Sequence, residues 1–240
     1  MPLLGSLELT GCKKRQPRRQ ATTELIAYLA MQRRPVRRAE LQEALWPGDD
    51  PRRSAARLYQ AVSEARRLFG DAFQRNRDAY ALDRERLRID ADEVDRLRRQ
   101  AEAAPEGEQL ALLEAALALF RGHPLAGIEA LWSATEQRRL TAIWVDLLER
   151  VGRRLLDDGN APGALNAAER AGSLDRSNEH AVQLAMEAEA LLCRRQAIIE
   201  RFECLRRDLD ERFGLEPSVD TKRLYRELLS QDSYNATSTA

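Results

Sequence analysis

The chain has 240 residues, of which 43% are hydrophobic and 32% are charged, and its formal net charge is zero. This length supplies enough material for two ordinary domains, each with its own core. No apolar run approaches the ~18 residues of a membrane span and the start is not signal-like, so we exclude a membrane protein and expect a cytoplasmic one.

The zero net charge hides an asymmetry along the chain. Residues 1–89 carry 19 Lys and Arg against 11 Asp and Glu, and the remainder carries 20 against 28. A basic end joined to an acidic end suggests a polyanionic partner for the first and a protein partner for the second. A solvated basic face is a common alternative, so charge alone supports this only weakly.

Leu, Ala, Arg and Glu dominate the sequence, which predicts a mainly α-helical fold. The three cysteines (Cys12, Cys193 and Cys204) and two histidines (His123 and His180) show no metal-binding spacing, so we expect reduced thiols and no metal. The sequence lacks a phosphate-binding glycine loop, a GxGxxG fingerprint, HExxH and GxSxG. We therefore expect no cofactor and no enzyme activity.

The first part of the chain predicts a strand over Leu4–Leu9, followed by a basic run over Lys13–Arg19. That run forms either a second strand or a loop that contacts phosphates. A first helix is expected over Gln20–Arg33, ended by Pro35, and a short helix over Arg38–Trp46.

A longer, very basic helix is expected over Arg52–Phe69, after a turn rich in proline and glycine. Its apolar face consists of Leu58, Val62, Ala65 and Phe69. Its opposite face consists of Arg53, Ala56, Gln60, Ser63 and Arg67, flanked by Arg52, Arg57 and Tyr59. Such a helix fits the major groove of DNA, where Arg reads guanine and Gln reads adenine. For an isolated Arg-rich helix, however, a solvated surface face is the more common explanation.

Two strands are predicted next, over Phe73–Asn76 and Tyr80–Asp83, turning near Arg77, with Leu87–Asp90 extending the sheet. Three helices followed by a basic hairpin is the order of a winged helix-turn-helix.

The segments ELIAYLAMQRRPVRRAELQEALWP, SAARLYQAVSEARRLFG, YALD and LRID resemble the winged-helix domain of the Streptomyces antibiotic regulatory protein family. The resemblance implies that Arg52–Phe69 is the recognition helix and that Phe73–Asp83 is the wing. The chain departs from the family in a shorter N-terminal strand region and in Glu64, where a basic residue is common. A carboxylate near DNA phosphates would weaken binding unless it pairs with Arg67, one turn further along.

The rest of the chain has a helical pattern throughout. Helices are expected at about 91–104, 107–120, 133–158, 162–173, 178–192, 195–213 and 221–230. Gly159, Ala164 and Ala168 have counterparts ~34 residues on, at Cys193, Ile198 and Phe202, which is the tetratricopeptide period.

The segments FRGHPLAGI, LWSATEQRRL, LLDDGNAPGALNAAERAGSLDRSNEHA and LRRDLDERFGLEPSVDTKRLYRELL resemble the bacterial transcriptional activator domain, which follows the winged helix in the same family. We therefore predict a winged helix over 1–90, a tetratricopeptide-like activator domain over 91–231 and a disordered tail over 232–240.

These features together favour a sequence-specific regulator of transcription, most simply an activator, that binds double-stranded DNA. The candidates for base reading are Arg53, Arg57, Gln60 and Arg67, with Arg52 and Ser63 on the same helix, and the candidates for phosphate contact are Arg38, Arg75 and Arg77. The helical array would contact RNA polymerase or a second copy of the chain as a homodimer. The alternative is an interaction module that does not bind DNA, the effector end of a larger signalling protein, whose repeats bind a partner peptide.

Overall fold

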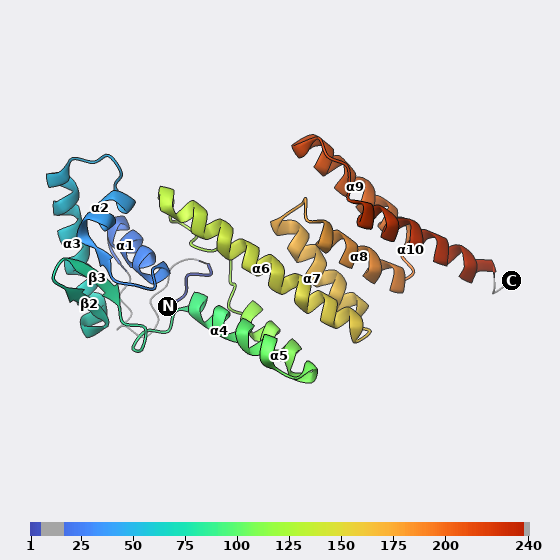
Figure 1. The fold of residues 1–240 in the computed structure, drawn as a ribbon, viewed down its shortest axis with the longest axis horizontal. Helices are drawn as coiled ribbons and strands as arrows, with labels where there is room; N and C mark the ends of the chain where they lie inside the picture. Colours follow the sequence, from blue (N-terminus) through green and yellow to red (C-terminus); the bar gives the residue numbers. More distant parts are fainter. Residues whose placement is uncertain (6–16, 238–240) are drawn as a thin grey trace. The chain divides into compact units, whose positions relative to one another are not determined.

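The computed structural model describes residues 1–5 and 17–237 (Figure 1). Over these residues the chain is mainly α-helical with a small antiparallel sheet, as the sequence predicts. Its contacts divide it into two compact units. Unit 1 comprises Met1–Ala103 and Ala115–Ala142, and unit 2 comprises Ala104–Glu114 and Ile143–Ala240.

Unit 1 begins with a three-helix bundle and a hairpin. Its elements are α1 (Gln20–Met31), β1 (Val36–Arg37), α2 (Arg38–Leu45), α3 (Pro51–Phe69), a 3₁₀ turn (Gly70–Ala72), β2 (Phe73–Asn76) and β3 (Ala79–Leu82). The three helices pack against one another, and β2 contacts α3 (Figure 1). Leu25, Leu29 and Leu58 are fully buried between the helices, and Trp46 closes the core at the end of α2. This order of elements is that of a winged helix-turn-helix.

The sheet differs from the prediction in its third strand. Its strand order is β1-β3-β2, because Val36 pairs with Tyr80, while Leu87–Ile89 forms no strand. The Asp83 carboxylate accepts hydrogen bonds from the backbone N–H groups of Glu85 (3.0 Å) and Arg86 (3.3 Å). This aspartate turn directs the chain away from β3, so the expected extension of the sheet over Leu87–Asp90 is wrong.

The predicted strand over Leu4–Leu9 lies mostly outside the described residues, and Leu4 itself is not in a strand. Leu3 and Leu4 are instead fully buried, and their N–H groups donate to the Asp90 carboxylate at 2.7 and 2.9 Å. The Leu4 carbonyl accepts from the N–H of Arg121 at 2.8 Å. The first residues thus join the start of α4 (Asp90–Ala103) to the segment that follows α5 (Glu106–Leu117).

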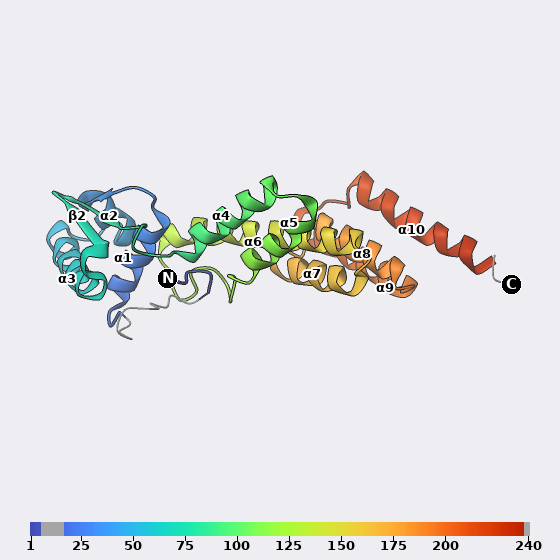
Figure 2. The same ribbon diagram turned by 90° about the horizontal axis from the view of Figure 1, so that it is seen from below.

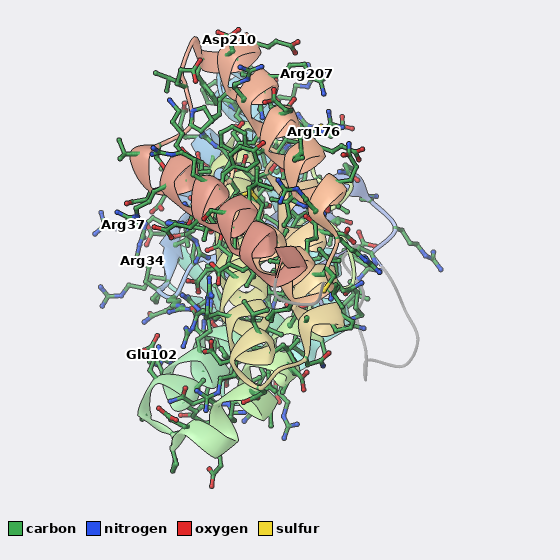
Figure 3. The ribbon with its side chains drawn as sticks, turned by 90° about the vertical axis from the view of Figure 1, so that its right-hand side faces the viewer. Arg34, Arg37, Glu102, Arg176, Arg207 and Asp210 are labelled. Carbon is green, nitrogen blue, oxygen red and sulfur yellow. The ribbon has the colours of Figure 1, made fainter. Side chains whose placement is uncertain are left out.

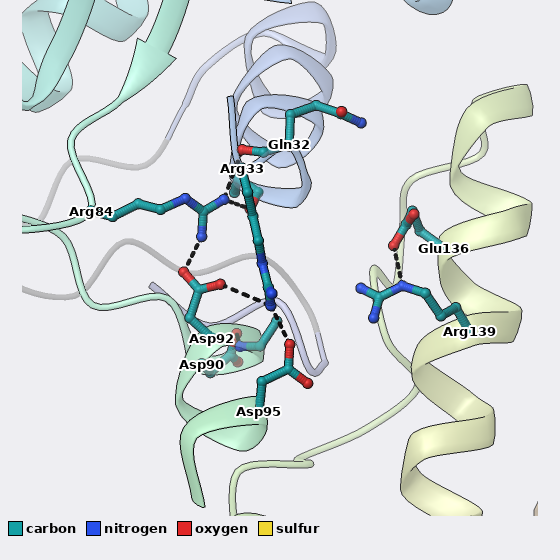
Figure 4. Close-up of polar contacts among 10 residues, drawn as sticks. Gln32, Arg33, Arg84, Asp90, Asp92, Asp95, Glu136 and Arg139 are labelled. Carbon is teal, nitrogen blue, oxygen red and sulfur yellow. Dashed lines mark hydrogen bonds and ion pairs between the residues drawn. The ribbon is translucent and has the colours of Figure 1, made fainter. Parts of the chain in front are cut away.

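A cluster of arginines and aspartates connects α1 to α4 within unit 1 (Figure 4). Arg84 donates to the carbonyls of Ala30 (2.7 Å) and Gln32 (2.8 Å) at the end of α1, and it also pairs with Asp92. Arg33 bonds to Asp95 and lies 3.4 Å from Asp92. Arg84 therefore satisfies carbonyls at a helix C-terminus and is not available to an external partner.

The remaining helices are α6 (Leu131–Asp157), α7 (Ala161–Leu174), α8 (Glu179–Leu191), α9 (Arg195–Phe213) and α10 (Val219–Thr237). The boundaries of the two units fall inside α5 and α6. In unit 2, α7 packs on α8 and α8 packs on α9 (Figure 2). Helix α10 contacts both α8 and α9. The outer side of α9 is charged, and Arg207 and Asp210 extend away from the ribbon (Figure 3).

The turns of unit 2 follow the predicted repeat of ~34 residues. Gly159 precedes α7 with φ of 78°, and its counterpart Cys193 precedes α9 with φ of 56°. Both positions are left-handed, a conformation that glycine adopts without steric cost and cysteine does not. The backbone conformation of the turn is therefore repeated after ~34 residues, although the residues at equivalent positions differ in size.

The start of α10 is held to α8 by the Glu179 carboxylate and by the Gln183 amide, which donates to the Thr221 hydroxyl at 2.7 Å. Glu179 accepts hydrogen bonds from the Ser218 N–H (2.9 Å), the Ser218 hydroxyl (2.7 Å) and the Thr221 hydroxyl (2.5 Å). These contacts fix the start of α10, which continues to Thr237, past the end at Ser230 expected from the sequence. No proline or glycine interrupts the chain after Ser230, so the helix meets no breaker there.

Candidate nucleic-acid interface

The start of α3 is set by local sequence. The Asp50 carboxylate accepts from the N–H groups of Arg52 (2.9 Å) and Arg53 (3.1 Å), and Pro51 occupies the first turn. Asp, Ser and Asn are preferred at this capping position, and proline fits the first turn because its missing N–H has no partner there. Arg52 and Arg53 are consequently held at an exposed helix N-terminus.

The two faces of α3 are separated as the sequence predicts. Leu58, Val62, Ala65 and Phe69 are buried against the rest of unit 1. After Pro51, the exposed residues of α3 are Arg52, Arg53, Ala56, Tyr59, Gln60, Ser63, Arg66 and Arg67. This outward face therefore presents guanidinium, amide and hydroxyl groups, which are the groups that bond to base edges and phosphates.

Arg57 is placed differently from the other candidates on α3. Its guanidinium carbon lies 4.8 Å from the centre of the Trp46 ring, and one nitrogen lies 2.7 Å from the Asp49 carboxylate. The side chain therefore stacks on the core tryptophan and is held by a neighbouring acid. We propose that Arg57 stabilises the turn between α2 and α3 and does not read a base.

Glu64 lies on the inner side of α3 and is buried. Its carboxylate accepts hydrogen bonds from the Thr22 hydroxyl (2.7 Å) and the Arg18 N–H (2.9 Å). The carboxylate does not stand among the outward groups, so the concern that it would repel phosphates does not apply. Instead it ties α3 to the start of α1.

The environment of Glu64 favours its charged form. Burial raises the pKa of this carboxyl, but the hydrogen bonds from Thr22 and Arg18 and the nearby charges of Arg19 and Arg67 outweigh burial. The pKa of Glu64 therefore lies below its ordinary value, and the carboxylate stabilises the fold above the pKa of the unfolded chain.

The variant Glu64→Gln is expected to lose about 1–2 kcal/mol of unfolding free energy at neutral pH, because its side chain loses charge-assisted hydrogen bonds. The wild-type advantage should disappear as the pH falls through the lowered pKa of Glu64. Urea unfolding at pH 7 and pH 3 measures this difference. Glu43→Gln, at an exposed position of α2, is the matched control, and an equal loss in both variants would contradict the structural assignment.

A cleft of about 380 Å³ lies between α3 and the hairpin. Its lining residues are Arg38, Ala55, Leu58, Tyr59, Val62, Ser63, Arg66, Arg75 and Tyr80. Arg38 from α2 and Arg75 from β2, both predicted from the sequence to contact phosphates, thus meet at one site. The third phosphate candidate, Arg77, is exposed at the hairpin turn with φ of 52° and does not line the cleft.

Two residues of the cleft were not among the sequence-based candidates. Arg66 lines the cleft, and Tyr59, treated in the sequence as a flanking residue, has 76% of its surface exposed. The helical periodicity of α3 contains the signal for both, because they stand three or four residues from Ser63 on the same side. What the periodicity does not show is that this side borders the hairpin.

Gln60 has a partner within unit 1. Its side-chain oxygen accepts a hydrogen bond from the Arg19 guanidinium at 2.5 Å. This contact orients the amide of Gln60 and adds Arg19 to the cations beside the outward face.

A winged helix-turn-helix followed by an array of paired helices defines a class of transcription regulators. The family model of the bacterial transcriptional activator domain matches residues 89–229, and the chain belongs to this family. The winged helix lies ahead of that domain, which is the domain order of the Streptomyces antibiotic regulatory protein family, so the resemblance stated from the sequence is confirmed.

A solved structure, that of Mycobacterium tuberculosis EmbR in complex with a low-affinity phosphopeptide, shares this fold. It matches 96% of the present chain with a TM-score of 0.82 and 20% sequence identity. The present chain spans 64% of that longer chain. Among curated proteins, no sequence matches significantly. Within the described residues, no helix is long and apolar enough to cross a membrane.

Proposed function

We propose that this regulator binds specific sequences of double-stranded DNA through α3 and the adjoining hairpin. The observation that carries the proposal is the outward face of α3, whose Arg52, Arg53, Gln60 and Arg67 are exposed beside a cleft lined by arginines. A helix with one buried apolar face and one such outward face fits the major groove.

The proposed DNA-binding residues fall into two sets, one that would contact base edges and one that would contact phosphates. Gln60, Arg53 and Arg67 lie on the outward face and are proposed to contact base edges, with Arg52 and Ser63 beside them. Arg38, Arg66 and Arg75 line the cleft, and with Arg77 at the hairpin turn they are proposed to contact phosphates. Phosphate contacts set position and affinity, whereas base contacts set specificity.

Salt dependence tests DNA binding directly. Four phosphate contacts by Arg38, Arg66, Arg75 and Arg77 predict a slope of about −3.6 in a plot of log affinity against log salt. Affinity should then fall about 150-fold between about 50 and 200 mM salt. Fluorescence anisotropy with duplexes selected from a random pool measures the slope. Failure to bind any duplex at low salt would contradict the proposal and leave a protein-interaction module.

Unit 2 is proposed to contact a protein, either RNA polymerase or a second copy of the chain. Exposed apolar side chains support this proposal, because Phe213, Leu215 and Val219 lie close together in sequence where α9 connects to α10. Large exposed apolar side chains that gather at one place are typical of interaction sites. Sedimentation over a range of concentrations distinguishes self-association from a requirement for the polymerase.

A further inference from the structure

Part of the lining of the cleft between α3 and the hairpin is apolar and aromatic. Contact with DNA phosphates alone does not require such a floor. Leu58 and Val62 line it from α3, and both are buried. Tyr80 from β3 and the exposed Tyr59 add two aromatic rings to the lining. An apolar, partly aromatic floor stabilises a planar apolar group, which a DNA phosphate does not supply.

The same cleft is strongly cationic. Arg38, Arg66 and Arg75 line it, and no lining residue is acidic. Among the described residues, no acidic side chain forms an ion pair with any of these three arginines. The guanidinium carbon of Arg75 lies 5.9 Å from the centre of the Tyr80 ring, so this cation is placed directly beside an aromatic surface. A ligand that enters the cleft therefore meets both a charge and a ring.

Size narrows the choice of ligand. The volume of about 380 Å³ lies within the range of small-molecule pockets, about 300–1,000 Å³. We propose that the cleft is a binding site for a small planar aromatic molecule that carries a phosphate, sulfonate or carboxylate group. The anionic group bonds to the arginines, and the ring packs on the tyrosines and the apolar floor.

Such a ligand would regulate the protein by competition. It would occupy the cations that the proposed DNA complex uses for phosphates, so bound ligand and bound duplex would exclude each other. This competition rests on the proposed DNA binding, whereas the binding of the small anion does not. The two are therefore measured separately.

The test uses anilinonaphthalene sulfonate, an aromatic sulfonate that fluoresces in apolar sites, with the full chain and no DNA. We expect saturable binding of one equivalent, weakened about tenfold in Arg66→Gln through loss of a charge-assisted hydrogen bond. Tyr59→Ala should also weaken it. Arg52→Gln is the matched control, because Arg52 is also an exposed arginine of α3 but does not line the cleft. Equal affinities in Arg66→Gln and Arg52→Gln would overturn the proposal.

Displacement of the dye identifies the chemistry that the cleft recognises. Adenosine monophosphate should displace it at lower concentration than either inorganic phosphate or adenosine. If inorganic phosphate displaces the dye as well as the nucleotide does, the cleft is a simple anion site and the proposal is wrong. If adenosine displaces the dye as well as the nucleotide does, the arginines do not contribute to ligand binding, and the proposal is also wrong.

A duplex that binds the chain should displace the dye. A duplex that binds without displacing it would overturn the competition. Dye binding that depends on Arg66, together with no binding of any duplex, would support the small-anion site while the proposed DNA-binding function fails.

Discussion

Replacing Glu189 with alanine is expected to lower the free energy of unfolding of unit 2 by about 3–5 kcal/mol, the usual cost of removing one partner of a buried ion pair. The Glu189 side chain is 3% exposed, and its carboxylate accepts three hydrogen bonds of 2.5–3.1 Å from the Arg201 guanidinium. Without Glu189, the mostly buried Arg201 keeps only one acidic partner among the residues that the structure describes, which is Glu169, at 3.3 Å and 55% exposed. Urea unfolding followed by circular dichroism measures the loss.

The variant Glu203→Ala is the matched control for this experiment. Glu203 forms an ion pair with Arg206 at 2.6 Å on the surface of α9, with both side chains about half exposed. An exposed pair of this kind contributes about 0–1 kcal/mol. Both variants make the same chemical change in a helix, so the difference between them reports burial. Similar losses in the two variants would refute a special role for the Glu189–Arg201 pair.

Replacing Arg67 with alanine is expected to remove sequence preference at one base position, worth about 1–3 kcal/mol of discrimination. Arg67 is exposed on the outward face of α3, and its Nε lies 3.4 Å from the Ser63 carbonyl, one turn back. The measurement compares binding to a selected duplex and to its single-base variants.

Arg75→Ala should weaken the binding of all duplexes alike and reduce the salt slope by about one, because Arg75 lines the cleft that is proposed to contact phosphates.

The variant Arg57→Ala tests whether an arginine of α3 that packs within unit 1 also contributes to base preference. Because Arg57 is held by Trp46 and Asp49, its removal should lower stability and leave base preference unchanged. If Arg57→Ala alters base preference in the way that Arg67→Ala does, the assignment of the outward face is wrong.

Much of the secondary structure followed from local pattern. The apolar spacing of α3, its proline-rich start and Gly70 at its end are all signals within one segment, and α3 begins within one residue of its predicted start. The helix predicted over 195–213 has the bounds of α9, between a left-handed turn at Cys193 and a left-handed Gly214. The resemblance to a known family added the expectation that α3 is a recognition helix and that the hairpin is a wing.

The errors arose where a residue's role depends on a distant neighbour. Val36–Arg37, and not Leu87–Asp90, completes the sheet because strand pairing is decided by the fold. Asp90 instead holds the N–H groups of Leu3 and Leu4, more than eighty residues earlier. The sequence wrongly suggested that the Glu64 carboxylate stands near DNA phosphates. In the structure this carboxylate accepts a hydrogen bond from Thr22 on α1 and is directed away from the outward face of α3.

The amino-acid sequence by itself determined which segments are helical, which side of α3 is apolar, and the family of the chain, because periodicity, capping residues and motifs are local properties. Only the tertiary structure decided which cations are available to a partner. Arg84 and Arg57 are paired with the internal acids Asp92 and Asp49. Arg38, Arg66 and Arg75 have no acidic partner among the described residues and converge on one cleft from three different elements. The physical reason is that a guanidinium bonds to whichever acceptors the fold brings within reach, and sequence spacing does not specify those acceptors.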